Sequence, residues 1–270
     1  MFPLRDDNPT LDKSIVTSII ITANIIVWIF VQGLGSGTTL IRSVCTWGLI
    51  PGELLGVVPE GTMIQCGRGM AYVVEDDPNW LSLITHMFMH GGWFHIIGNL
   101  WFLSVFGDNV EDAMGRVRFV VFYLLCGLAA AGAQILSNPG SAMPMVGASG
   151  AIGGVMGAYA ILYPNAGVHV LIFFGIIMRI ILPAWIMLGY WFLLQLIGGI
   201  PSIAGSGGGV AFWAHIGGFI AGVVLIQIFQ DRKRVAEHRP TSTHSLPSPG
   251  RTGFLLRSPR ICWATMMCTS

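Results

Sequence analysis

Charged residues are scarce in this chain, and long apolar runs take their place. Only 10% of the 270 residues are charged, 53% are hydrophobic, and the mean hydropathy is +0.70. Soluble domains carry about a quarter charged residues. The shortage of charge therefore excludes an ordinary soluble domain and indicates a polytopic protein of the lipid bilayer. The net charge of +1 provides no basic excess, so we expect no nucleic-acid partner.

Metal-binding patterns are also missing. The five cysteines have no metal-type spacing, and no H-E-x-x-H sequence is present, so a zinc protease would lack its base. We expect no metal and no cofactor. The histidines His86, His90 and His95 form the one alternative metal set, but their H-x3-H-x4-H spacing fits a single helical face poorly. Cys45 and Cys66 share one loop and pair if that loop faces an oxidising compartment, which leaves their pairing open.

The apolar runs predict an all-α membrane protein, a bundle of six transmembrane helices over residues 14–230. Residues 1–13 are expected to be a polar cytoplasmic segment, and residues 231–270, rich in Arg, Pro, Ser and Thr, a disordered cytoplasmic tail. The polar loop from 33 to 83 is expected at the membrane surface. The predicted spans are 14–33, 93–107 with some preceding residues, 117–136, 146–163, 180–199 and 207–229.

The segment 168–200 is apolar but is interrupted by Arg179 and Pro183. We interpret it as one span that follows a short surface-lying or re-entrant piece. The alternative of two full spans would need about 40 residues and a turn.

The distribution of Lys and Arg predicts the orientation, because short cytoplasmic loops are enriched in both. The loops 137–145 and 200–208 contain neither. Both termini are therefore expected in the cytoplasm, and spans two, four and six run inward with their N-terminal halves at one depth. The cationic residues lie before span one, after span two and after span six: Arg5, Lys13, Arg116, Arg118, Arg232, Lys233 and Arg234.

Four polar side chains fall within those N-terminal halves. His95 and Asn99 share one helical face of span two, Ser149 begins span four, and His215 lies in span six. Polar groups are costly in hydrocarbon, so inside a span they indicate function. Separately, each has a simpler explanation, since serine packs helices and His or Asn often forms interhelical hydrogen bonds. Their joint occurrence at one depth favours a reactive site.

These residue types suit a serine hydrolase. A serine hydroxyl needs an adjacent base, and His215 is the candidate. Negative charge in an acyl-transfer intermediate needs donors, which His95, Asn99 and the backbone N–H of Ser149 can provide. Small-residue faces would let spans four and six approach closely. Those faces are Ser149, Gly153, Gly157 and Ala160 on span four, and Ala211, His215, Gly218 and Gly222 on span six.

At these residues the chain resembles the rhomboid intramembrane serine proteases, over about residues 14–230. Each motif is short, but the four in this order are specific. They are G-x-S-G at 147–150, H-x-x-x-N at 95–99, A-H-I-G-G at 214–218 with Gly222 beyond, and Glu111 to Gly115-Arg116 after span two.

The resemblance implies that Ser149 is the nucleophile and His215 the base of a dyad without a carboxylate. It implies an oxyanion role for His95 and Asn99, and substrate contacts at Gly147 and Ala148. Glu111 and Arg116 would form a structural pair, and His86 and His90 would brace a loop. The family often has a tyrosine one turn after the nucleophile, where this chain has Gly153.

The resemblance also implies membrane-protein substrates cleaved in or near their transmembrane segments, with no cofactor. Short outer loops suggest a bacterial inner membrane. The oligomeric state is open. Two rival hypotheses remain: an inactive relative that binds membrane proteins, and a transporter or channel. The intact Ser149 and His215 disfavour the first, and the lack of internal repeats disfavours the second.

Overall fold

Helices formed by the apolar runs dominate the fold. The computed structural model describes residues 1–67, 70–74, 77–173, 177–203 and 210–238. The long helices are α1 (Ile15–Phe30), α5 (Trp93–Met114), α6 (Arg116–Ser137), α7 (Ser149–Leu162), α8 (Ala184–Ile203) and α9 (Phe212–Phe229). The short ones are η1 (Gly33–Gly35), α2 (Gly37–Trp47), α3 (Pro51–Leu54), α4 (Ser82–Thr85), η2 (His86–Phe88) and α10 (Arg232–His238).

Three of the described helices are long and apolar enough to cross a membrane, namely α6, α8 and α9. Helices α1 and α7 are apolar but shorter, and α5 carries three carboxylates in its last two turns. The structure is therefore mainly helical with three candidate membrane spans among the described residues, and the count of six spans stays a prediction.

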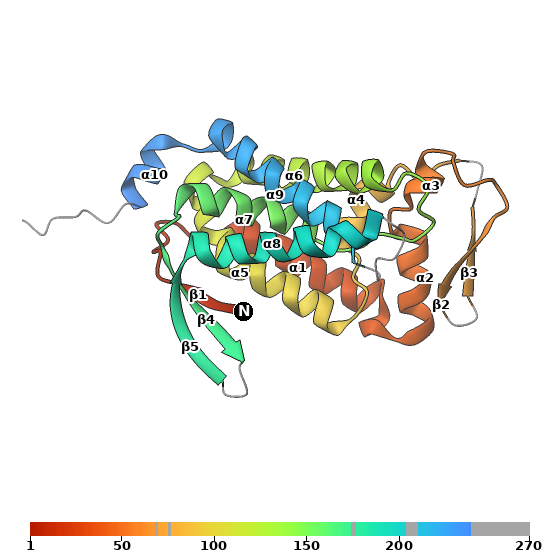
Figure 1. The fold of residues 1–270 in the computed structure, drawn as a ribbon, viewed down its shortest axis with the longest axis horizontal. Coiled ribbons are helices and arrows are strands. Elements are labelled where there is room, and N and C mark those ends of the chain that lie inside the picture. Colours follow the sequence, from red (N-terminus) through yellow and green to blue (C-terminus); the bar gives the residue numbers. More distant parts are fainter. Residues whose placement is uncertain (68–69, 75–76, 174–176, 204–209, 239–270) are drawn as a thin grey trace, which may run out of the picture. The chain divides into compact units, whose positions relative to one another are not determined.

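Two small sheets depart from the all-α prediction. Strands β4 (Gly167–Phe173) and β5 (Ile177–Pro183) form an antiparallel hairpin, and β1 (Phe2–Asp6) pairs with β4. Strands β2 (Met63–Gly67) and β3 (Met70–Val73) form a second hairpin. Figure 1 shows the two sheets at opposite ends of the long helices.

The β4–β5 hairpin occupies the segment that we predicted to be a short surface-lying or re-entrant piece before one span. That piece is extended backbone, and its place relative to the membrane stays a prediction. Val168 and Val170 alternate with more exposed neighbours and are fully buried, which is the period of a strand. Valine and isoleucine are as apolar as the residues of a membrane span, but their β-branched side chains favour extended backbone. The N-terminal segment, expected to be a polar extension, supplies β1.

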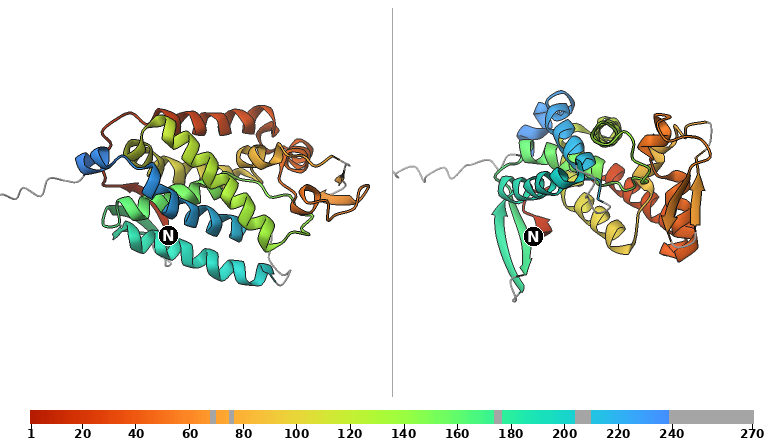
Figure 2. Two further views of the ribbon diagram at one scale, coloured as in Figure 1. Left: turned by 90° about the horizontal axis from the view of Figure 1, so that it is seen from above. Right: turned by 45° about the vertical axis from the view of Figure 1, so that its right-hand side comes forward.

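Helix α9 lies beside α6, α7 and α8 in both views of Figure 2. Its contacts with α6 and α7 run through residues without bulky side chains. A methyl group on Gly217 would strike Ala133 of α6, and one on Gly218 or Gly222 would strike the backbone of α7 at Gly150 or Gly154. This close approach, predicted from the small-residue faces, sets the position of His215.

The first part of the segment 231–270, which we predicted to be a disordered tail, forms a helix. Residues 232–238 form α10, and the backbone N–H of Asp231 donates to the carbonyl of Ala113 at the end of α5, 2.8 Å away. Val235 packs on the main apolar core. Order therefore extends at least to His238, and the rest of the predicted tail lies outside the described residues.

Candidate active site

Ser149 is the first residue of α7 and follows the loop that connects α6 to α7. Gly147 in this loop has φ +125°, a conformation that favours glycine. Its N–H donates to the carbonyl of His86, 2.9 Å away. A Cβ there would lie 2.6 Å from Nε2 of His95 and 3.3 Å from Oγ of Ser149. The absence of a side chain at Gly147 thus leaves room between these two groups.

The serine hydroxyl meets His215 of α9. The Ser149 Oγ and His215 Nε2 atoms are 2.7 Å apart, a hydrogen-bond distance. Both residues are partly buried. The two elements are held together at Gly150 and Gly218, where the glycine at each position permits backbone contact. The sequence positions 149 and 215 are therefore brought into direct contact by helix packing.

The other imidazole nitrogen of His215 has a partner that the sequence analysis missed. Nδ1 of His215 lies 2.8 Å from Oε1 of Gln195 on α8. Nε2 of Gln195 donates to the carbonyl of Trp191, 3.1 Å away. Asn99 was identified because it is a polar side chain inside an apolar span. Gln195 is also a polar side chain in an apolar segment, so the sequence alone could have indicated it as a candidate.

Trp191 is the second residue that the sequence analysis missed. Its ring lies 5.8 Å from the ring of His215, centroid to centroid, at 38°. The position after the nucleophile where the family often has tyrosine is Gly153, and a Cβ there would approach the carbonyl of His215 to 3.0 Å. The aromatic neighbour of the histidine thus comes from α8.

His95 and Asn99 of α5 line the second of two cavities that contain Ser149. Nδ1 of His95 accepts from the N–H of Gly91, 3.2 Å away, so its proton is on Nε2, which faces Gly147. Asn99 is 6% exposed, and its Nδ2 donates to the carbonyl of His95 at 3.0 Å. The first N–H groups of α7 add further donors, because the start of a helix leaves them without intrahelical partners.

Two cavities meet at Ser149, His95 and His215. The first holds about 300 Å³ and the second about 210 Å³. Asn99 and Trp191 line the second cavity, together with apolar side chains. Gly147 lines the first cavity, whereas Ala148 is fully buried behind it. The apolar residues of the second cavity are Phe94, Phe102, Ile152 and Met156.

His86 and His90 support the loops near the site. Nδ1 of His86 lies 2.7 Å from the carbonyl of Ser82. The backbone of His90 exchanges two hydrogen bonds with the side chain of Gln32. The ring of His90 lies 5.2 Å from that of His95. Among the described residues, no group of three or more His, Cys, Asp or Glu could hold a metal ion.

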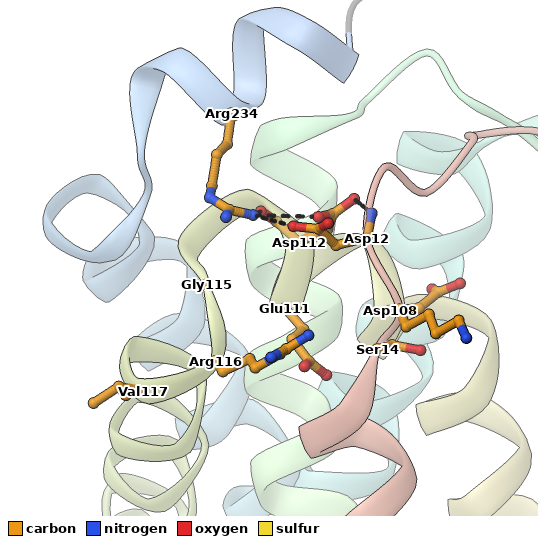
Figure 3. A pocket seen from close by; sticks show the side chains of 10 residues that line it. Asp12, Ser14, Asp108, Glu111, Asp112, Gly115, Arg116, Val117 and Arg234 are labelled. Carbon is orange, nitrogen blue, oxygen red and sulfur yellow. Dashed lines mark hydrogen bonds and ion pairs between the residues drawn. The ribbon is translucent and has the colours of Figure 1, made fainter.

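Glu111 has a different role from the pair with Arg116 that the resemblance implied. Its carboxylate accepts from the N–H groups of Val16 and Thr17, at 2.9 and 2.7 Å, and from the hydroxyl of Thr17 at 2.8 Å. It therefore caps the start of α1. Figure 3 shows it below Asp112, which Arg234 contacts at 3.5 Å.

The cysteines divide by position. Cys45 in α2 is disulfide-bonded. Cys126 in α6 is buried as a free thiol, as expected for an inert thiol in a span. The side chain of Cys66 lies outside the described residues, so the pairing of Cys45 with Cys66 in particular stays a prediction.

Comparison with known proteins adds independent information. A family model described as the Rhomboid domain matches residues 77–232. Rhomboid-like protein 11, chloroplastic, of Arabidopsis thaliana is 32% identical over 164 residues, 57% of this chain and 54% of that protein. Rhomboid protease GluP of Bacillus subtilis is 33% identical over 143 residues, 53% of this chain and 25% of that protein. Rhomboid-related protein 2 of Mus musculus is 29% identical over 159 residues, 58% and 50% respectively.

The chain spans about half, or less, of the length of these curated relatives. They come from a plant, a bacterium and a mammal, so they give no support to the bacterial inner membrane over another membrane.

Proposed function

The chain belongs to the rhomboid family, and we propose that it is a serine endopeptidase that hydrolyses peptide bonds in or near transmembrane segments of other membrane proteins. The observation that carries the proposal is the 2.7 Å contact between Oγ of Ser149 and Nε2 of His215, at the junction of two cavities. The bilayer is the medium in which enzyme and substrate meet. Relatives named as rhomboid proteases support the same activity.

The reaction begins with proton transfer. Nε2 of His215 takes the proton from Ser149 as Oγ bonds to the carbonyl carbon of the substrate. The carbonyl oxygen then carries negative charge. His95, whose Nε2 is a donor, and the N–H groups at the start of α7 stabilise that charge, and Asn99 can contribute a second amide proton.

The intermediate collapses when His215 returns the proton to the leaving nitrogen and the C–N bond breaks. An acyl ester on Ser149 remains. Water attacks this ester, with His215 again accepting a proton, and the serine is restored. The reaction needs no group beyond these side chains, backbone donors and water.

The substrate must enter as an extended strand. A helical peptide keeps its carbonyl groups in internal hydrogen bonds, so it has to unwind before attack. The second cavity offers apolar walls at Phe94, Phe102 and Met156 for a side chain of such a strand. From the Lys and Arg distribution we infer that both termini are cytoplasmic, which places these cavities toward the outer face.

The test is covalent labelling of the detergent-purified protein with a fluorophosphonate probe. Wild type is compared with Ser149→Ala, His215→Ala and a control, Ser104→Ala. Ser104 is an exposed serine of α5 that donates to the carbonyl of Trp101, outside the site. We expect labelling of wild type and control, and none of the two site variants.

Cleavage of a generic transmembrane substrate in the same samples tests the activity itself. The two site substitutions are expected to be non-additive, because the residues act as a unit. A double variant far slower than either single variant would contradict the dyad. A folded wild type that neither reacts with the probe nor cuts the substrate would instead favour a protein that binds membrane partners without cleaving them.

A further inference from the structure

Gln195 connects a third helix to the candidate base. It lies on α8, whereas His215 is on α9 and Ser149 on α7, and α8 lies beside α9 in Figures 1 and 2. The side chain is 9% exposed. Its Oε1 atom lies 2.8 Å from Nδ1 of His215, on the side of the ring opposite Ser149.

The hydrogen bonds around Gln195 fix which imidazole nitrogen carries the proton. The amide nitrogen of Gln195 donates to the carbonyl of Trp191, so the amide oxygen is the atom that faces His215. An amide oxygen only accepts hydrogen bonds. Nδ1 of neutral His215 must therefore be protonated. Nε2 then holds a lone pair, directed at the hydroxyl of Ser149.

We propose that Gln195 is a positioning residue, which holds His215 as the Nδ1-protonated tautomer and orients the imidazolium that forms when Ser149 is deprotonated. This inference rests on the proposed protease function. It assigns to a neutral amide the position that a carboxylate holds in a Ser-His-Asp triad. Trp191 supports the arrangement from the same helix, through its carbonyl toward Gln195 and its ring toward His215.

The hydrogen bond from Nδ1 of His215 to the amide oxygen of Gln195 should contribute most free energy when the imidazole ring is charged. A hydrogen bond to a charged group contributes more than one between neutral groups. The loss of the Gln195 acceptor should therefore weaken the transition state more than substrate binding. We expect kcat to fall about 10- to 100-fold with KM nearly unchanged.

A purely structural role predicts something else. If Gln195 served only to join α8 to α9, its replacement by an apolar residue of similar size would alter stability but leave the tautomer of His215 as it is. The two roles are separated by a measurement on the ring itself.

The experiment is ¹⁵N NMR of histidine-labelled protein in detergent, at about pH 8, where histidine is mainly neutral. His215→Asn identifies the His215 signals among the seven histidines. Wild type should show Nδ1 protonated and Nε2 unprotonated. A wild-type spectrum with the proton on Nε2 would overturn the proposal, whether or not any variant folds.

Three variants complete the test. Gln195→Leu should give a mixture of tautomers and the kcat loss. Gln195→Glu, which keeps an acceptor beside Nδ1, should retain the wild-type tautomer and recover much of kcat. Gln134→Leu is the control, a glutamine of α6 outside both cavities, and should change neither. Gln195→Leu with the wild-type spectrum and wild-type kcat would refute the role.

The spectrum also separates the two proposals. If the wild type shows the expected tautomer but neither reacts with the fluorophosphonate nor cleaves a substrate, the protease function fails while the position of Gln195 stands. If cleavage is found and the tautomer is the opposite one, the role of Gln195 fails alone.

Discussion

Replacement of Gly222 by alanine is expected to inactivate the protein from a distance. Gly222 lies two turns of α9 beyond His215 and touches neither cavity. The new methyl carbon would lie 2.6 Å from the carbonyl carbon of Gly154 and 2.7 Å from its Cα atom. Carbon atoms in contact are normally at least about 3.5 Å apart. These neighbours are backbone atoms of α7, so the helices must separate by about 1 Å.

The same separation would act on the candidate dyad. Moved apart by about 1 Å as rigid helices, Ser149 and His215 would lose a hydrogen bond that measures 2.7 Å. A misplacement of this size can lower a rate by about 10²-fold. Overpacking also costs about 1–3 kcal/mol of stability. We therefore expect strong losses of both fluorophosphonate labelling and cleavage, with a lowered Tm.

The matched control is Gly132→Ala in α6. A Cβ at Gly132 meets no atom within 4 Å. The same chemical change should there gain about 0.5–1 kcal/mol, because alanine favours a helix over glycine. Activity should stay at the wild-type level. Wild-type labelling and Tm in Gly222→Ala would refute the argument that the α7–α9 glycine contact sets the geometry of Ser149 and His215.

Three further changes test separate parts of the structure. Asn99→Ala should slow cleavage about 10²-fold without abolishing it, because His95 and the start of α7 still donate; wild-type kinetics would remove Asn99 from the oxyanion role. Glu111→Ala should lower the free energy of unfolding by about 2–3 kcal/mol, because it removes the acceptor of three hydrogen bonds at the start of α1; an unchanged thermal melt would contradict the cap. Burial raises the pKa of Asp6, so folding favours its protonated form, and this contribution to stability is lost as pH rises through the folded pKa. As the pH is lowered from about 7 to about 4.5, the Tm of wild type should therefore rise relative to the Tm of Asp6→Asn measured at the same pH. A difference between the two Tm values that does not change with pH would argue against a raised pKa of Asp6.

The sequence predicted the helices and their order because hydropathy is a property of consecutive residues. Ser149 was expected at the start of a helix and is found there. Family membership was also predictable, since four short motifs in one order specify it, and the match of the Rhomboid domain to residues 77–232 confirms it. The catalytic roles of Ser149 and His215 stay predictions.

The features that escaped prediction depend on contacts between distant segments. The rotation of α8 about its axis decides whether Gln195 faces His215 or lipid, and hydropathy does not encode rotation. The cap of α1 connects Glu111 to Val16 and Thr17, which are 95 and 94 positions away in sequence. The β1–β4 pairing joins segments more than 160 positions apart, and Val168 and Val170 fit an apolar span as well as a buried strand.

Two histidines that line the same cavities can serve opposite chemical roles, because their other ring nitrogens meet opposite partners. A backbone N–H of Gly91 is directed at Nδ1 of His95, which makes Nε2 of that ring a donor. A carbonyl oxygen of Gln195 is directed at Nδ1 of His215, which makes Nε2 of that ring an acceptor. The hydroxyl of Ser149 lies beside the acceptor nitrogen of His215. Negative charge that develops in the proposed reaction would lie near the donor nitrogen of His95. The proposed division between base and oxyanion donor therefore depends on groups outside the motifs, and exchange of Gln195 should disturb the reaction even with all four motifs intact.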